Sequence, residues 1–133
     1  MKKVLVDTSV WIDFFNSKSL SPEIIRLQEL IINNSVCICP VIYQEILQGI
    51  KNDNIFEQVK DILSDFSMLN IEIMEVTNYA VDLYRKLRKM GITIRKSADC
   101  LIASYAILND VYLLQKDRDF LEIAKGSQLK ILI

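Results

Sequence analysis

Four acidic residues of this chain have the positions expected of a reactive site: Asp7, Glu45, Asp99 and Asp117. Carboxylates bind hard divalent cations such as Mg²⁺ or Mn²⁺. The 133 residues include 17 acids and no histidine, which excludes Ser-His-Asp and Cys-His nucleophile systems and histidine-ligated zinc sites. Most of the other acids fall in turns or on the polar side of a helical pattern, as do Glu57, Asp61 and Asp65.

Asp7 follows three aliphatic residues at 4–6 that do not alternate with polar residues. Such a run is typical of a strand that is covered on both faces, as in a parallel sheet. In open α/β sheets the ligand crevice lies outside the carboxyl ends of the strands, so Asp7 is a candidate for chemistry. The alternative interpretation is a helix N-cap, because Asp, Thr and Ser all cap well and residues 10–15 look helical.

The other three acids also follow a predicted strand or open a predicted helix. Asp117 comes just after a strand at 111–114 and faces Asp7 if the two strands are neighbours. Asp99 opens an apolar helix, where a buried carboxylate is costly unless it is paired or bound to a metal; the alternative is a first-turn acid favoured by the helix dipole. Glu45 follows the second strand within a helix, and its alternative is a solvated helix acid.

All four acids can therefore meet at the carboxyl edge of one sheet. Carboxylates held close together repel each other and raise each other's pKa values. A divalent cation removes that conflict, and Mg²⁺ bound in this way keeps waters and an open side for phosphate oxygens. We therefore expect a site for Mg²⁺ or Mn²⁺.

The elements that position these acids alternate along the chain between strands and helices. Strands are predicted at 4–6, 36–39, 71–76, 111–114 and 129–133, and helices at 10–15, 21–33, 41–50, 55–69, 77–90, 97–108 and 117–125. This order predicts a three-layer α/β/α fold with a five-stranded parallel sheet and right-handed crossovers. The length favours a single domain over residues 1–133.

Composition limits where the protein works. No apolar run approaches the roughly 20 residues that span a membrane, and the apolar run after Met1 is too short for a signal peptide. Cys37 and Cys39 are expected to be reduced core residues of a cytoplasmic protein. The formal net charge of −1 gives no global attraction to nucleic acid, so a polyanion partner needs a local basic patch or a metal ion.

Four segments of the chain resemble the PIN-domain family in their order and spacing, and the resemblance covers essentially the whole chain. The segments are residues 4–13, 43–49, 99–106 and 113–120. The type they resemble most is the VapC toxin of bacterial and archaeal toxin–antitoxin pairs. The resemblance implies a Mg²⁺- or Mn²⁺-dependent ribonuclease with a five-stranded parallel sheet.

The resemblance also implies roles for individual residues. The invariant acids of the family fall on Asp7, Glu45, Asp99 and Asp117. The small hydroxyl after the first acid, usually a support residue, falls on Thr8 or Ser9. The chain departs from the family at Gln115, where Thr is frequent, and at Tyr105, where His is frequent. Asp119 is taken as a further support residue, and whether it shares the role of Asp117 is open.

A basic strip leads to Asp99. Six of the 16 Lys and Arg residues lie between 85 and 96, ending in Arg95 and Lys96. The strip is either a solvated helix face or, beside a phosphate-cutting site, a guide for the RNA backbone. Lys116 and Arg118 flank Asp117 and are predicted to contact RNA similarly.

The family resemblance implies two protein partners: a small antitoxin whose tail enters the acidic groove, and usually a second copy of the chain. One alternative is a non-catalytic module that uses the acids to bind a partner's arginines, which is compatible with an enzyme. The other is a phosphoacceptor receiver domain, which needs paired acids after the first strand and an aspartate after the third.

Overall fold

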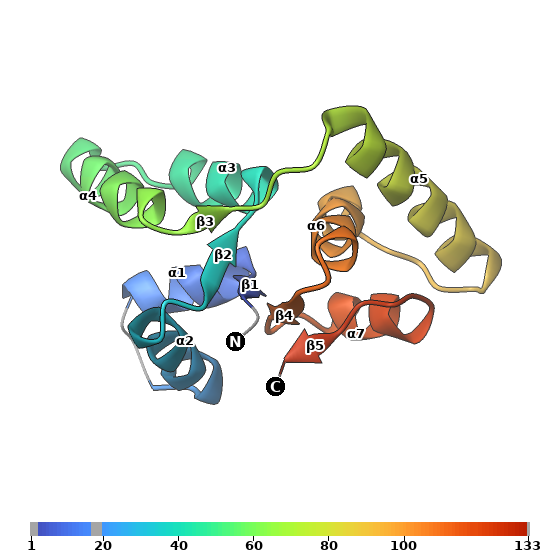
Figure 1. Cartoon of the computed structure of the whole chain (residues 1–133), viewed down its shortest axis with the longest axis horizontal. Coiled ribbons are helices and arrows are strands. Elements are labelled where there is room, and N and C mark those ends of the chain that lie inside the picture. The colour runs from blue at the N-terminus through green and yellow to red at the C-terminus, as the bar shows by residue number, and fades with distance from the viewer. Residues whose placement is uncertain (1–2, 17–19, 133) are drawn as a thin grey trace.

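The computed structural model describes residues 3–16 and 20–132 (Figure 1). Within these ranges the chain forms five strands and seven helices. In chain order they are β1 (Val4–Val6), α1 (Thr8–Asn16), α2 (Pro22–Ile32), β2 (Val36–Ile38), α3 (Pro40–Gln48), α4 (Asp53–Ser64), β3 (Ser67–Met68), α5 (Ile73–Lys89), α6 (Ser97–Leu108), β4 (Tyr112–Leu114), α7 (Arg118–Lys125) and β5 (Ile131–Leu132).

The strands form one parallel sheet in the order β3-β2-β1-β4-β5. Val4 of β1 pairs with Val36 on one side and with Tyr112 on the other. The predicted three-layer α/β/α fold with a five-stranded parallel sheet is confirmed. In Figure 1 the elements up to β3 lie on one side of the molecule and those from α5 onward lie on the other. The strand order reverses between β1 and β4, which is where open α/β sheets bind ligands.

The centre of the core consists of the strands without polar alternation and one nearly apolar helix. Every residue of β1 and β2 is buried, as the sequence pattern indicates for strands covered on both faces. Helix α6 is buried at Asp99, at Cys100 and from Ile102 to Ala106, and it packs against α5, α3, α7 and β4. Cys37 and Cys39 are buried free thiols, as predicted. The acid at the start of α6 is thereby carried into the interior.

Helix α5 ends in a left-handed glycine. Gly91 has φ of 80°, and the backbone N–H of Ile92 donates to the carbonyl of Leu87. Glycine adopts this conformation without the steric cost of a Cβ, so the helix stops at Lys89, within one residue of the predicted end at 90. The chain then runs without helix or strand to Lys96, the N-cap of α6.

The predicted third strand at 71–76 is wrong. Residues 73–89 form α5, whose N-cap Glu72 accepts a hydrogen bond from the backbone N–H of Glu75 at 2.8 Å. The actual third strand, Ser67–Met68, is exposed and pairs only with β2. An edge strand of two residues has no apolar pattern to reveal it, whereas the apolar residues at the start of α5 imitate one.

The remaining boundaries differ by a few residues. Helix α4 ends at Ser64 rather than at 69, because the chain must turn there to enter β3. The predicted strand at 129–133 is shorter, and its last residue lies outside the described residues. Among the described helices, none is both long and apolar enough to cross a membrane.

Candidate active site

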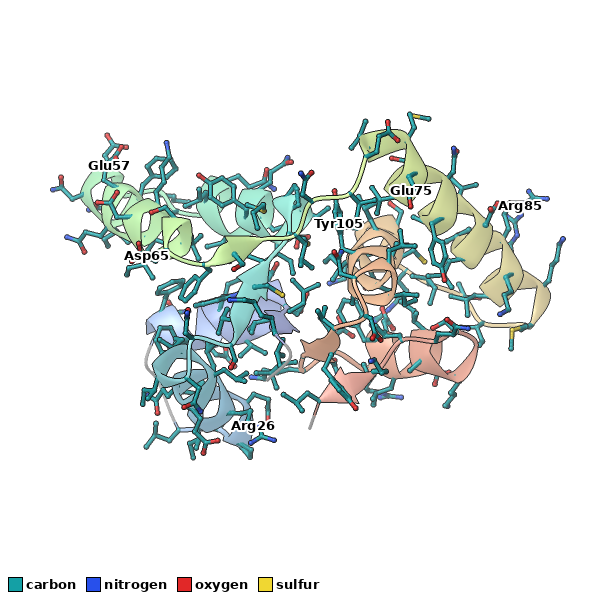
Figure 2. All side chains as sticks on the ribbon, viewed as in Figure 1. Arg26, Glu57, Asp65, Glu75, Arg85 and Tyr105 are labelled. Atoms are coloured by element: carbon teal, nitrogen blue, oxygen red, sulfur yellow. The ribbon has the colours of Figure 1, made fainter. Side chains whose placement is uncertain are left out.

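Acidic residues of this molecule fall into two contrasting environments. The acids on α4 and at its C-terminal end, among them Glu57 and the C-cap Asp65, are exposed (Figure 2). Asp7, Asp99 and Asp119 are instead 6%, 5% and 9% exposed, and they are the buried charged side chains among the described residues. Burying a carboxylate costs free energy unless it is paired or bound to a cation, so three of them near the carboxyl ends of β1 and β4 indicate a site.

Asp7 follows β1, and its backbone N–H donates to the carbonyl of Leu114 at the end of β4. Its Oδ2 accepts hydrogen bonds from the Ser9 backbone N–H at 3.1 Å and from the Ser9 hydroxyl at 2.6 Å. The side chain therefore does cap the start of α1, and it also lies at the edge of the sheet. Burial raises the pKa of Asp7, the Ser9 bonds oppose that rise, and the charge of Glu45 adds to it.

Glu45 is brought to Asp7 by α3. Its Oε1 accepts a hydrogen bond of 2.6 Å from the Thr8 hydroxyl, and Thr8 is the residue next to Asp7. The side chain is half-buried, so Glu45 is not the freely solvated helix acid of the alternative interpretation. Both hydroxyls that the resemblance marks as support residues thus bond to predicted site acids.

Asp99, Asp117 and Asp119 form a second group, whose carboxylate oxygens lie within 4.8 Å of one another. Asp99 lies in the first turn of α6, and Asp117 is the N-cap of α7 and accepts from the Asp119 backbone N–H at 3.0 Å. Burial raises the pKa of Asp99 to about 7, while Lys96 opposes the rise and the charges of Asp7, Asp117 and Asp119 add to it. The coupling of Asp7 to Asp99 joins the two groups electrostatically.

The donor set fits a hard divalent cation. Oδ2 of Asp99 is buried and accepts no hydrogen bond from any described residue. A bare carboxylate oxygen in the interior, with further carboxylates that raise its pKa, is stabilised by a cation. Because the available ligand atoms are carboxylate oxygens, Mg²⁺ and Mn²⁺ suit them better than softer ions.

The cations predicted to contact RNA differ in their surroundings. Arg95 forms two hydrogen bonds with Asp119, at 3.2 and 3.4 Å. Lys96 lies 3.6 Å from Asp117. Lys116 is paired with Asp13 of α1, a contact between residues 103 positions apart that no sequence pattern reveals. Arg118 is exposed at the first position of α7.

Gln115 and Tyr105, the two departures from the family, occupy different places. Gln115 follows β4, next to the residue that bonds to the Asp7 backbone, and its Oε1 is buried without a partner among the described residues. Tyr105 is 3% exposed in the core face of α6 (Figure 2), about 9 Å along the helix from Asp99 at 1.5 Å per residue. The first departure therefore borders the site and the second does not.

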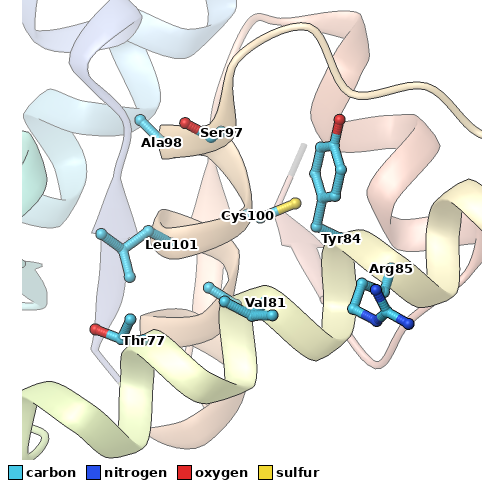
Figure 3. A pocket seen from close by; sticks show the side chains of 9 residues that line it. Thr77, Val81, Tyr84, Arg85, Ser97, Ala98, Cys100 and Leu101 are labelled. Carbon is cyan, nitrogen blue, oxygen red and sulfur yellow. The ribbon is translucent and has the colours of Figure 1, made fainter.

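Two hollows lie near α6 and α3. One of about 490 Å³ lies between α5 and α6, and residues that line it include Val81, Tyr84, Ser97, Cys100 and Leu101 (Figure 3). Since these α6 positions flank or oppose Asp99 around the helix, this hollow faces away from the carboxylates.

The second hollow, a groove of about 390 Å³, lies between α1, α3 and α4 and includes Glu45 among its lining residues. Its apolar side chains include Ile12 and Ile55, which are 47% and 49% exposed. This groove adjoins the acidic site, and sequence patterns did not predict it, because its walls come from three helices.

Comparisons with known proteins agree with this geometry. The family model described as "PIN domain" matches residues 4–126. Ribonuclease VapC11 of Mycobacterium tuberculosis is 30% identical over 129 residues, which cover 96% of both chains. Ribonuclease VapC1 of Methanocaldococcus jannaschii is 33% identical over 130 residues, covering 97% of this chain and 86% of that protein.

Among solved structures, VapBC2 from Rickettsia felis bound to a DNA fragment from its promoter has a chain with the same fold. The TM-score is 0.76 at 22% identity, and the match covers 97% of this chain and 96% of that chain. The family model spans the strands and helices that carry every acid of the site. This chain therefore belongs to the PIN-domain family.

Proposed function

We propose that this protein is a divalent-metal-dependent ribonuclease that hydrolyses RNA phosphodiester bonds, as the toxin of a type II toxin–antitoxin pair. The observation that carries the proposal is the buried Oδ2 of Asp99, which lies among further carboxylates and has no hydrogen-bond partner in the described part of the chain. The names of the two ribonuclease relatives, which match over nearly the whole chain, support the same activity. A receiver domain is disfavoured, because Leu69 and Asn70 follow β3 where it needs an aspartate.

In this proposal the acids hold Mg²⁺ or Mn²⁺. Asp7 and Asp99 are direct ligands, and Glu45 and Asp117 bind directly or through water. The bound ion supplies an oriented water of lowered pKa and neutralises charge on the phosphate. Ser9 fixes the orientation of Asp7 through its two hydrogen bonds.

The remaining residues of the site position Glu45 and attract the substrate. Thr8 holds Glu45 beside Asp7 through one hydrogen bond. Arg95, Lys96 and Arg118 are exposed cations beside the carboxylates, and they attract the RNA backbone to an otherwise acidic edge. No side chain acts as a nucleophile.

The test is incubation of the purified protein with total RNA, with Mg²⁺ and with EDTA, followed by mapping of the cut ends. Cleavage that requires the metal and leaves defined ends supports the proposal. Cleavage that persists in EDTA, or no cleavage with either Mg²⁺ or Mn²⁺, contradicts it. The mapped ends also show which RNA is cut.

The antitoxin partner is proposed to occupy the groove between α1, α3 and α4. Its apolar walls suit an apolar segment, and Glu45 suits an Arg or Lys of that segment. We expect Ile55→Asp to abolish co-purification with the antitoxin, whereas Ile25→Asp, at a similarly exposed position on α2, leaves it intact. Equal binding by both variants would exclude the groove.

A homodimer is proposed on the exposed apolar side of α5. Ile73, Met74 and Val81 are more than half exposed there, at 63%, 54% and 51%. Such residues on one helix favour burial against a second copy. Light scattering should give twice the mass of one chain for the unchanged protein, and the mass of a single chain for Val81→Asp.

A cytoplasmic location stays a prediction, which cell fractionation tests.

A further inference from the structure

The two basic residues before α6 contact the carboxylates of the α7 N-terminus in different ways. The Arg95 side chain, 73% exposed, donates from Nε to Oδ2 of Asp119 and from Nη2 to Oδ1. Lys96 lies 3.6 Å from a single oxygen of Asp117, beyond normal hydrogen-bond distance. The guanidinium is thus held in a fixed plane, and the ammonium is not.

The three carboxylates that lie close enough to share an ion are not equally available to it. Oδ2 of Asp99 has no partner among the described residues. Asp117 accepts one backbone hydrogen bond through Oδ1. Asp119 has both oxygens bonded to Arg95. A metal ion at Asp119 would therefore share oxygens that already accept hydrogen bonds from a guanidinium, whereas Oδ2 of Asp99 accepts none from the described residues.

The geometry of the pair leaves one edge of the guanidinium available. Arginine has five N–H donors, and Asp119 takes one from Nε and one from Nη2. The donors that remain are on Nη1 and Nη2, and together they form a second fork. Such a fork matches two oxygens of a phosphate.

Arg95 needs an external constraint to present that fork. It lies between α5 and α6 in a stretch without helix or strand. Ile94, which is 4% exposed, anchors the backbone beside it. Asp119 is only 9% exposed and belongs to the first turn of α7, so it provides a fixed base for a long exposed side chain.

We propose that Asp119 is a positioning residue that holds Arg95 at the rim of the acidic site, where the outer fork of the guanidinium binds an RNA phosphate. This inference rests on the proposed ribonuclease function and gives Asp119 a role different from that of Asp117. Asp117 binds the metal ion, and Asp119 acts on the substrate through Arg95.

The experiment compares Asp119→Asn, Arg95→Ala, their double variant and Asp117→Asn. Mn²⁺ affinity is measured on the RNA-free protein by calorimetry, and kcat and KM are measured on a single-stranded RNA. We expect Asp119→Asn and Arg95→Ala each to raise KM about tenfold, since each removes the same charged hydrogen bonds, and kcat and Mn²⁺ affinity to stay within about twofold. The double variant should be no worse than either single variant.

Matched variants separate this role from a structural one. Glu122→Gln removes an exposed ion pair with Lys125 on the same helix and should leave KM unchanged. Asp119→Glu, which keeps the charge, should recover part of the loss of RNA affinity. Far-UV circular dichroism checks that every variant is folded.

Two results would overturn the inference. One is a loss of Mn²⁺ affinity in Asp119→Asn as large as in Asp117→Asn, because that would make Asp119 a metal ligand. The other is multiplication of the two KM effects in the double variant. The calorimetry requires no turnover, so it decides the role of Asp119 even where the unchanged protein cleaves no RNA and the ribonuclease proposal itself fails.

Discussion

The two halves of the acidic site are held in place by different kinds of partner. On the β1 side, Asp7 and Glu45 accept hydrogen bonds from the neutral hydroxyls of Ser9 and Thr8. On the β4 side, Asp117 and Asp119 lie beside exposed cations. Hydroxyls fix geometry without cancelling charge, whereas a cation lowers the net negative charge that faces the substrate. The β1 side is therefore built for ligand orientation and the β4 side for balancing charge.

The largest expected effect comes from removing a carboxylate from either side. Asp7→Asn and Asp99→Asn should each lower Mg²⁺-dependent RNA cleavage at least about 10³-fold, because the metal contributes several kcal/mol to the transition state. Asp61→Asn, at an exposed position on α4, is the matched control. Near-normal turnover in either site variant would contradict the assignment, since the carboxylate on that side would then be unnecessary for cleavage.

A pH series tests the raised pKa of Asp99 next. The pKa of Asp99 is about 7 in the folded protein, against 3.8 for an aspartate that is not buried. The folded state therefore keeps this proton at pH values where the unfolded chain has lost it. The contribution of this group to the stability of the metal-free protein is present below about pH 4 and is lost as the pH rises to about 7.

Metal binding has the opposite dependence, because the ion requires the ionised carboxylate. Mn²⁺ affinity should fall about ten- to thirtyfold from pH 7.5 to pH 5.5, as one proton competes at Asp99. Calorimetry at the two pH values measures this change. Asp99→Asn should raise the free energy of unfolding of the metal-free protein at pH 8, by at most about 4 kcal/mol, the equivalent of a shift of roughly three pKa units. A destabilised variant at that pH would contradict the assignment of the raised pKa.

A smaller effect is expected from a hydroxyl on the β1 side. Ser9→Ala removes the 2.6 Å bond to Asp7 but keeps the bond from the Ser9 backbone N–H. We expect about a tenfold loss of kcat, in the range of one hydrogen bond to a charged group, with KM for RNA unchanged. A rise in KM without a change in kcat would place Ser9 in substrate binding instead.

The smallest effect is expected from a cation that is already paired outside the site. Lys116 contacts Asp13 of α1, and exposed ion pairs of this kind contribute about 0–1 kcal/mol. Lys116→Ala should therefore change RNA affinity less than about twofold at low salt. Fluorescence anisotropy against salt concentration tests this, and a loss as large as that of Arg95→Ala would support the sequence-based prediction that Lys116 contacts RNA.

The strengths of the sequence patterns explain which of these features could be predicted. Apolar runs without polar alternation predict β1 and α6. Asp7 follows from the rule that ligands bind outside the carboxyl ends of parallel strands, and Asp99 follows from the cost of burying an unpaired carboxylate. The edge strand β3 left no such pattern, and Ile73 and Met74 at the start of α5 were interpreted as strand residues.

Pairings between distant residues could not be predicted in the same way. The contacts of Lys116 with Asp13 and of Arg95 with Asp119 join residues of separate elements. The apolar periodicity within one element does not predict such contacts. The sequence therefore indicated which carboxylates to expect at the site but not which cation belongs to which acid.

The pairing of β1 with β4 joins the two halves of the sheet, and the acidic site forms only when these halves are together. Asp7 and Glu45 belong to the part that ends with β3, whereas Asp99, Asp117 and Asp119 belong to the part that begins with α5. A cut in the short connection between those parts, residues 69–72, leaves neither fragment with a full ligand set. Under the proposed function, ribonuclease activity then requires reassembly, so two separately expressed fragments would be active only when both are present.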